Sequence, residues 1–570
     1  MSKLEIAIAS LLTLLAGLIF YPFASLGVDP HHDGIMLKPA LDVLSGQVLF
    51  RDTFSQYGPL TTYLQALALG VSPTLLSLRL LTGAAYAASL FFLYLAWRSL
   101  LPRSLAVVAG LMFILYAPFY DPDWLMFPWS SVLALLFQSV AIWALLRIVA
   151  GHTHAAWAWT LGISCACTLW CRQPVGIILT GSVGVIAVAL YGVGWRSPGG
   201  ASMRVWVRVA CGFGGIGALV LGHLVMNGAL GAWWEQNILW PQRWARSVGG
   251  HDPLGLREAF LRMDHALGLF GLLLLGLSPA LLRRYRPTLP RWFDLVWLTI
   301  CVLAYVCFAS DWAQAWLLIP TGGWSTLIVG LIILQTFFVL LPLIWRRSSL
   351  KSLDFFRLAA LSGVTLGSLL QLYPYPCPHH VFWALAPALG LGIYLCWRWS
   401  RAEASLCAIV ILLLLIPASY YKYQRAQYNL QQPAITLESP VAFRGMRVGL
   451  ERAQALQRID EVLRPLLAAN PDRPGLLYGD DAIYLAWFKN GQNPSPYYVN
   501  WGGLLSPDDW RKRAFFIEDR QPVLFFVKPR RLEEVGKFLQ AVGYEVVYNE
   551  AALNLFIALP IPPKSGSLTP

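Results

Sequence analysis

Two carboxylates near the start of the chain have the chemistry of a proton acceptor. Asp29 and Asp33 follow the first apolar segment, which ends near residue 26. At that place a carboxylate is close enough to a membrane to meet a lipid head group, and a positioned carboxylate can take the proton of a hydroxyl that attacks a sugar carbon. The alternative is that both are solvated loop acids. The pair is therefore a candidate catalytic site.

Basic side chains at two later positions are suited to bind a phosphate. Arg172 lies in a hinge between apolar segments that is short enough to keep it at the membrane edge, and His379 and His380 lie between later segments at the same level. If these groups converge, they would hold a leaving phosphate through charge-assisted hydrogen bonds. The alternatives are a helix-end arginine that reaches the interface and a pair of interfacial cap histidines.

Two further observations concern metals and a second acidic pair. Imidazole and carboxylate ligands suit Zn or Mn, but their spacing matches no compact motif, so we expect no required cofactor and keep a divalent metal as the alternative. Asp121 and Asp123 precede the fourth apolar segment, where they would orient a substrate or begin a helix. The candidate metal ligands would be His31, His32, His379, His380, Asp29 and Asp33.

The elements that must position these residues are membrane helices. Of the 570 residues, 57% are hydrophobic and 13% are charged, and the mean hydropathy is +0.56. One or two water-soluble cores cannot bury that much apolar surface. A spanning helix needs about 20 apolar residues, and interruptions at that spacing predict about thirteen spans. The expected spans centre near residues 6–26, 76–97, 104–119, 127–149, 155–170, 175–192, 206–227, 266–282, 293–309, 324–345, 356–372, 381–397 and 405–419.

Basic residues predict the orientation of these spans. Under this count the short loops that carry arginine, such as those with Arg98, Arg147 and Arg283, all fall on one side. Positively charged short loops stay in the cytoplasm, so we expect a multi-pass bacterial inner-membrane protein with a cytoplasmic N-terminus. The net charge of +13 then needs no nucleic-acid partner. The alternative, that residues 6–20 are a signal peptide, would leave the next loop without its anchor.

The chain is predicted to have two domains. Residues 1–419 would form an α-helical polytopic membrane domain, and residues 420–570 a soluble periplasmic α/β domain with a disordered tail. Its expected helices cover 452–469 and 531–542, and its expected strands cover 476–478, 523–527, 545–548 and 553–558. The first external loop, residues 28–75, would carry two surface helices, Ile35–Leu44 and one that starts at Pro59.

These segments together resemble the GT-C superfamily of glycosyltransferases, in the branch that contains protein O-mannosyltransferases and the aminoarabinose transferase of lipid A. In that branch an Asp-Glu pair opens the first external loop, and a Tyr-Gly-Pro-Leu element and an Arg-Leu pair follow. One departure is that Gly34 replaces the expected Glu, so the role of that second carboxylate is absent or is taken by Asp29. The matching residues are Asp33-Gly34, Ala40, Gly46, Arg51-Asp52, Gln56-Tyr57-Gly58-Pro59-Leu60 and Arg79-Leu80.

Later motifs extend the resemblance. The branch has a Lys-Gly-Pro-Val-Gly turn whose basic residue approaches the lipid phosphate, and residues 172–176 read Arg-Gln-Pro-Val-Gly. The resemblance implies an inverting transferase that uses a polyprenyl-phosphate sugar, with Asp33 as general base. It implies a donor phosphate bound by Arg172, His379 and His380. We expect further substrate contacts from His32, Tyr57, Arg79, Asp121 and Asp123.

Two rival functions remain open. A transporter or flippase of lipid-linked glycan would need charged groups near the bilayer midplane, and the predicted spans are nearly free of them. A glycan ligase or polymerase is also polytopic, but the acidic loop here comes early in the chain. The sugar and the acceptor, whether lipid, glycan or protein, are left open. The C-terminal domain would be structural or would help to select the acceptor.

Overall fold

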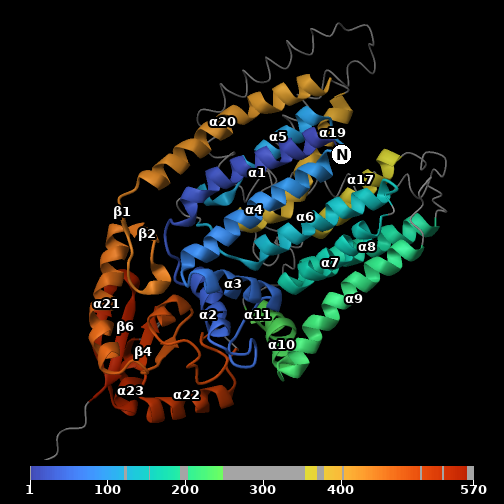
Figure 1. The fold of residues 1–570 in the computed structure, drawn as a ribbon. Helices are drawn as coiled ribbons and strands as arrows, with labels where there is room; N and C mark the ends of the chain where they lie inside the picture. The colour runs from blue at the N-terminus through green and yellow to red at the C-terminus, as the bar shows by residue number, and fades with distance from the viewer. Residues whose placement is uncertain are drawn as a thin grey trace, which may run out of the picture.

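The computed structural model describes residues 2–120, 125–152, 154–192, 203–247, 353–368, 378–400, 403–500, 504–528 and 532–561. The spans expected at 266–282, 293–309 and 324–345 lie outside these residues, as do Asp121 and Asp123. Figure 1 shows a layer of long helices, with the C-terminal domain packed at one end of it.

Four described helices are long and apolar enough to cross a membrane: α1 (Lys3–Ala24), α4 (Leu75–Trp97), α6 (Ser130–Val149) and α9 (Met203–Met226). Shorter or less apolar helices lie beside them, so the expected polytopic helical architecture is present but the count of about thirteen spans is not confirmed. The expected span 381–397 is broken into two helices by the 3₁₀ turn Ala386–Ala388. Helices beside these four include α5 (Arg103–Leu115), α7 (Ala155–Cys171), α8 (Gln173–Gly192), α17 (Leu353–Ser368), α18 (Pro378–Leu385), α19 (Leu389–Ser400) and α20 (Ala404–Gln431), and the short helix α11 (Trp240–Ser247) lies near α3 in Figure 1.

Helix α20 continues beyond the domain boundary that we predicted at residue 419. Its second half, after Ser419, is rich in tyrosine, glutamine and other polar residues, but it contains neither Gly nor Pro before Pro433. The change in composition therefore marks the end of the apolar surface and not the end of the helix. Figure 1 shows α20 (orange) reaching from the helical layer to the C-terminal domain.

The first external loop contains both predicted helices, α2 (His32–Leu44) and α3 (Pro59–Val71). Pro59 begins α3 because its fixed φ and missing N–H suit the first helical position. The polar stripe of α3 is its buried face: Gln65 Nε2 donates to the Pro128 carbonyl at 2.6 Å, whereas Leu67 is 70% exposed. The apolar residues Leu60, Tyr63 and Leu64 are partly buried and pack against the hydrophobic cores, whereas Val71 at the end of the helix is exposed like Leu67.

The C-terminal domain has the predicted α/β pattern. A four-stranded sheet has the order β3 (Gly475–Tyr478), β4 (Val523–Val527), β6 (Leu555–Pro560) and β5 (Tyr544–Glu550), with β3 and β4 parallel and the other pairs antiparallel. Helices α21 (Leu450–Ala469) and α23 (Leu532–Val542) match the predicted ranges within two residues. The prediction missed the short pair β1 (Ala434–Thr436) and β2 (Arg447–Gly449), and α22 (Pro507–Arg520), which starts with a capping box.

The C-terminal domain packs directly on the first external loop. The Ile483 N–H donates to the Pro30 carbonyl at 3.2 Å, and Arg452 Nη1 donates to the Val28 carbonyl at 2.6 Å. In Figure 1, α2 and α3 lie between the long helices and this domain. The loop and the domain therefore share one side of the helical layer.

Asp42, near the end of α2, is a second point of contact between the loop and the domain. Its side chain is fully buried. It accepts hydrogen bonds from Lys38 Nζ at 2.5 Å and Thr53 Oγ1 at 2.8 Å within the loop, and from the Gly491 N–H at 2.8 Å and Asn493 Nδ2 at 3.2 Å in the domain. A buried carboxylate needs such partners, because an unpaired charge is costly in a protein interior.

Candidate active site

The segment of residues 125–131, which leads into α6, brings together residues predicted for the site; we call it the linking segment. Trp129 is at its centre. The Trp129 ring centroid lies 4.9 Å from that of His32, 5.3 Å from that of His379 and 5.6 Å from that of His380. The imidazoles of the first loop and of α18, far apart in the sequence, therefore meet at one aromatic ring.

Arg172 reaches the linking segment from the hinge between α7 and α8, where its Nη1 donates to Ser131 Oγ. The start of α3 packs against the same hinge. The Gly58 N–H donates to the Cys171 carbonyl at 3.2 Å, and a Cβ on Gly58 would lie 2.0 Å from the Trp170 carbonyl oxygen. Glycine is required because no side chain fits there. The Tyr-Gly-Pro-Leu element and the basic hinge are thus in contact.

Asp33 is fully buried and is ion-paired with Arg79 of α4, which is also fully buried. Arg79 Nη2 lies 2.5 Å from Asp33 Oδ2, and Arg79 Nη1 donates to the Leu26 carbonyl at 2.5 Å. Asp33 Oδ2 also accepts from the Asp29 N–H at 2.8 Å, whereas Asp33 Oδ1 has no hydrogen-bond partner among the described residues. Burial raises the pKa of Asp33, and the Arg79 charge opposes that shift. The pair fixes the end of α1 to the start of α2.

Asp29 and His32 form a second pair on the more open side of the same turn. Asp29 Oδ1 accepts from the His31 N–H at 3.0 Å and the His32 N–H at 2.6 Å, and it lies 3.1 Å from His32 Nδ1. The side chains of His32 and Asp29 are 34% and 31% exposed. Burial alone would raise the pKa of Asp29, but the hydrogen bonds and charge of His32 lower it well below its usual range.

The packing around Gly34 explains why this chain has no glutamate at the second position of the Asp-Glu pair. A Cβ at this position would lie 2.3 Å from the backbone nitrogen of Ile483 and 2.9 Å from the carbonyl carbon of Ala482. Real Cβ atoms do not approach backbone that closely. The C-terminal domain thus occupies the space where a glutamate side chain would begin.

Two amide side chains that we did not predict support the hinge. Gln236 and Asn237 lie in η2 (Glu235–Leu239), a single π-helical turn, and such turns are frequent at functional sites. Asn237 Oδ1 accepts from Gln173 Nε2 at 2.7 Å, and Gln236 Nε2 donates to the Phe50 carbonyl at 2.7 Å. The only sequence signal was an amide pair inside a Trp-rich stretch.

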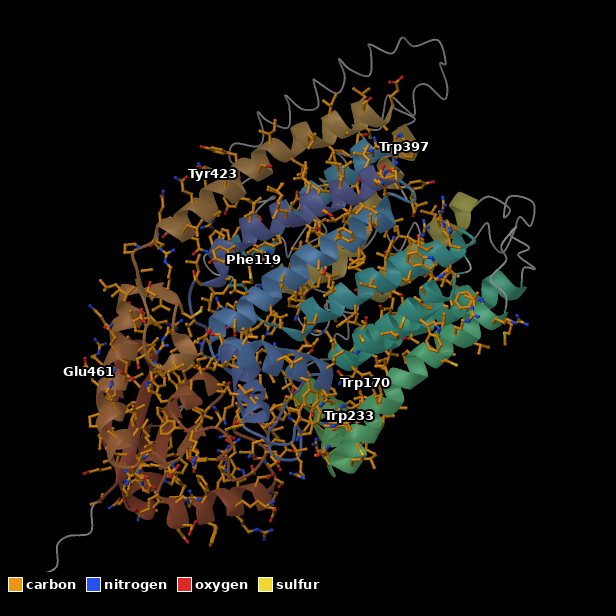
Figure 2. The ribbon with its side chains drawn as sticks, in the orientation of Figure 1. Phe119, Trp170, Trp233, Trp397, Tyr423 and Glu461 are labelled. Atoms are coloured by element: carbon orange, nitrogen blue, oxygen red, sulfur yellow. The ribbon has the colours of Figure 1, made fainter. Side chains whose placement is uncertain are left out.

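Aromatic residues hold this turn against the rest of the fold. Helix α10 (Leu230–Trp234) ends immediately before η2. Figure 2 labels Trp170 and Trp233, which lie side by side where α7 meets α10, with ring centroids 5.6 Å apart. Residues 230–239 are thereby packed against the hinge that carries Arg172.

The remaining predicted residues have mixed outcomes. His379 is fully buried, its Nε2–H donates to the Leu125 carbonyl at 2.8 Å, and burial lowers its pKa to about 3. Its role in binding a phosphate stays a prediction. Tyr57 packs at the edge of the main hydrophobic core. Among the described residues, no group of three or more His, Cys, Asp or Glu side chains is arranged to hold a metal ion.

No protein-family model matches the sequence, and no curated protein matches it. Two solved structures of other proteins are similar to the chain at low sequence identity. The Archaeoglobus fulgidus oligosaccharyltransferase, in complex with Zn and sulfate, has a TM-score of 0.47 and 13% identity over 92% of this chain and 68% of that one. ArnT from Cupriavidus metallidurans, bound to undecaprenyl phosphate, has a TM-score of 0.41 and 14% identity over 99% of this chain and 98% of that one.

Proposed function

We propose that this protein is a membrane glycosyltransferase that moves a sugar from a polyprenyl-phosphate donor to an acceptor hydroxyl, with inversion. The observation that carries the proposal is the convergence on the linking segment. There, Arg172 and the imidazoles of His32, His379 and His380 meet within one region at the end of the membrane helices. A phosphate-binding cation beside proton-accepting groups is what sugar transfer from a lipid phosphate requires.

Within this proposal, Arg172 binds the donor phosphate, and His380, stacked on Trp129 of the same segment, contributes to the site. The turn of residues 29–33 supplies the group that takes the acceptor proton, and the sequence resemblance assigns this role to Asp33. The site and the C-terminal domain lie on the periplasmic side of the bacterial inner membrane. The basic short loops on the opposite side support that orientation.

Incubation of the purified protein with a panel of undecaprenyl-phosphate sugars and lipid or peptide acceptors tests this function. We expect release of undecaprenyl phosphate that depends on the acceptor, with a product of inverted anomeric configuration. A transporter would move the lipid-linked glycan across liposomes without releasing the lipid phosphate, and that result would replace the proposal.

Arg172→Ala is expected to raise the apparent KM for the donor or to lower kcat, because the lipid phosphate loses a charge-assisted hydrogen bond. Arg172→Lys should recover part of the loss, since an ammonium keeps the charge but not the planar fork of donors. Steady-state kinetics with the donor found in the panel provide the measurement. Unchanged kinetics in a folded Ala variant would show that Arg172 is an interfacial residue without a role in binding.

A further inference from the structure

The turn of residues 29–33 contains a fully buried carboxylate, Asp33, and a partly exposed imidazole–carboxylate pair, His32 and Asp29. We propose that His32, held by Asp29, takes the proton of the acceptor hydroxyl, and that Asp33 holds the turn in place. This inference rests on the proposed function and assigns its proton transfer to a different residue from the one that the sequence resemblance implies.

The contact between His32 and Asp29 sets the orientation of the imidazole ring and the position of its proton. Every hydrogen bond described for the Asp29 side chain ends on Oδ1, including the one at 3.1 Å to His32 Nδ1. When Nδ1–H donates to the carboxylate, the lone pair of the neutral ring is on Nε2. The ring is packed by Phe127 at 4.7 Å and Trp129 at 4.9 Å between centroids. The structure thus sets both the orientation of the imidazole and its tautomer.

Access separates Asp33 from the pair of His32 and Asp29. A general base must come within hydrogen-bond reach of the proton that it takes. Asp33 has no exposed surface, and its Oδ2 is occupied by Arg79 and the Asp29 N–H. The His32 side chain is 34% exposed, and its Nε2 forms no hydrogen bond to a described residue. An acceptor can therefore reach the exposed part of the His32 ring but not the carboxylate of Asp33.

The proton affinities of the two side chains also favour His32 over Asp29 as the proton acceptor. The lowered pKa of Asp29 makes its carboxylate a weak base. Imidazole is the side chain that gains and loses a proton near neutrality, and a carboxylate hydrogen-bonded to Nδ1–H stabilises the imidazolium that forms. Asp29 thus acts as a positioning residue, in the manner of the aspartate in Ser-His-Asp sites.

The transfer step balances with these groups alone. The acceptor oxygen forms a bond to the anomeric carbon as the bond from that carbon to the phosphate oxygen breaks. Polyprenyl phosphate leaves with the bonding electron pair. The hydroxyl proton passes to His32 Nε2, and the imidazolium then returns that proton to solvent.

The test compares variants in the transfer assay, using the donor that the panel identifies and the full-length protein. His32→Gln is expected to lower kcat by about 10²–10⁴-fold with the donor KM unchanged, the range of general-base contributions. Added imidazole should restore part of the turnover of His32→Ala. Asp29→Asn should lower kcat without rescue by imidazole, because the ring remains but its tautomer is no longer fixed. His154→Gln, which changes an exposed histidine at the start of α7, is the control and should keep turnover close to wild type.

Normal turnover of a folded His32→Gln protein would overturn the inference and leave the proposed function intact. So would loss of transfer in a folded Asp33→Asn protein whose His32→Gln counterpart remains active, since Asp33 would then be the base. If His32→Gln fails to fold, His32→Asn keeps an amide donor near the Nδ1 position, and the imidazole rescue of His32→Ala decides. If the wild-type protein releases no lipid phosphate from any donor, the proposed function itself fails.

Discussion

Replacing Asp33 with Asn is expected to destabilise the protein by about 3–5 kcal/mol, the usual cost of removing one partner of a buried ion pair. Both Asp33 and Arg79 have no exposed surface, so the substitution leaves a guanidinium charge in the interior without a counter-charge. The amide can still accept a hydrogen bond, but it cannot neutralise Arg79. Thermal unfolding of the detergent-purified protein, followed by tryptophan fluorescence, measures the loss.

Asp52→Asn is the control, because Asp52 lies in the same loop and pairs with an arginine that is half exposed. We expect a much smaller shift in its unfolding temperature, since exposed ion pairs contribute little. The double variant Asp33→Leu with Arg79→Met should recover stability, because apolar pairs often replace buried ion pairs without loss. Equal shifts for Asp33→Asn and Asp52→Asn would contradict a structural role for the buried pair.

Gly34→Glu, which restores the Asp-Glu pair of the resembled branch, is expected to abolish transfer rather than to improve it. A Cβ alone would lie 2.3 Å from the Ile483 nitrogen, so α2 and the C-terminal domain must separate to admit any side chain. Overpacking typically costs about 1–3 kcal/mol, and here the obstacle is backbone that cannot change rotamer. Limited proteolysis should show cleavage around residues 480–500 at lower protease concentration than in wild type.

Gly70→Ala provides the comparison for that variant. Gly70 lies in α3 of the same loop, its nearest atom to an added Cβ is 3.8 Å away, and alanine favours a helix. We expect wild-type transfer and proteolysis. Wild-type activity of Gly34→Glu would mean that α2 and the domain are apart in the active state.

The residues with local signals were predicted well. Pro59 after Gly58, the apolar run Val523–Val527 and the spacing of α21 each depend on a few neighbouring residues, and the structure has these elements where they were expected. The site was harder to predict, because its centre depends on contacts between distant segments. Trp129 has no local pattern that distinguishes it from other interfacial tryptophans. Its importance follows only from its contacts with α2 and α18.

Three predictions depended on signals that do not report how distant segments pack. The boundary at residue 419 was placed by composition, which reports on the surroundings of a helix and not on its length. The general-base role of Asp33 stays a prediction, and the motif that suggested it does not reveal that this carboxylate is fully buried. Gly34 was noted as a missing carboxylate, but only the packing of Ile483 explains why no side chain is present.

The contacts of Asp42 have a practical consequence for exchanging parts between related proteins. One buried carboxylate receives hydrogen bonds from Lys38 and Thr53 of the first loop and from Gly491 and Asn493 of the C-terminal domain. A chimera that takes the domain from another protein, but keeps this loop, would leave part of that set unmatched. A stable chimera therefore requires that the first loop and the C-terminal domain be exchanged together.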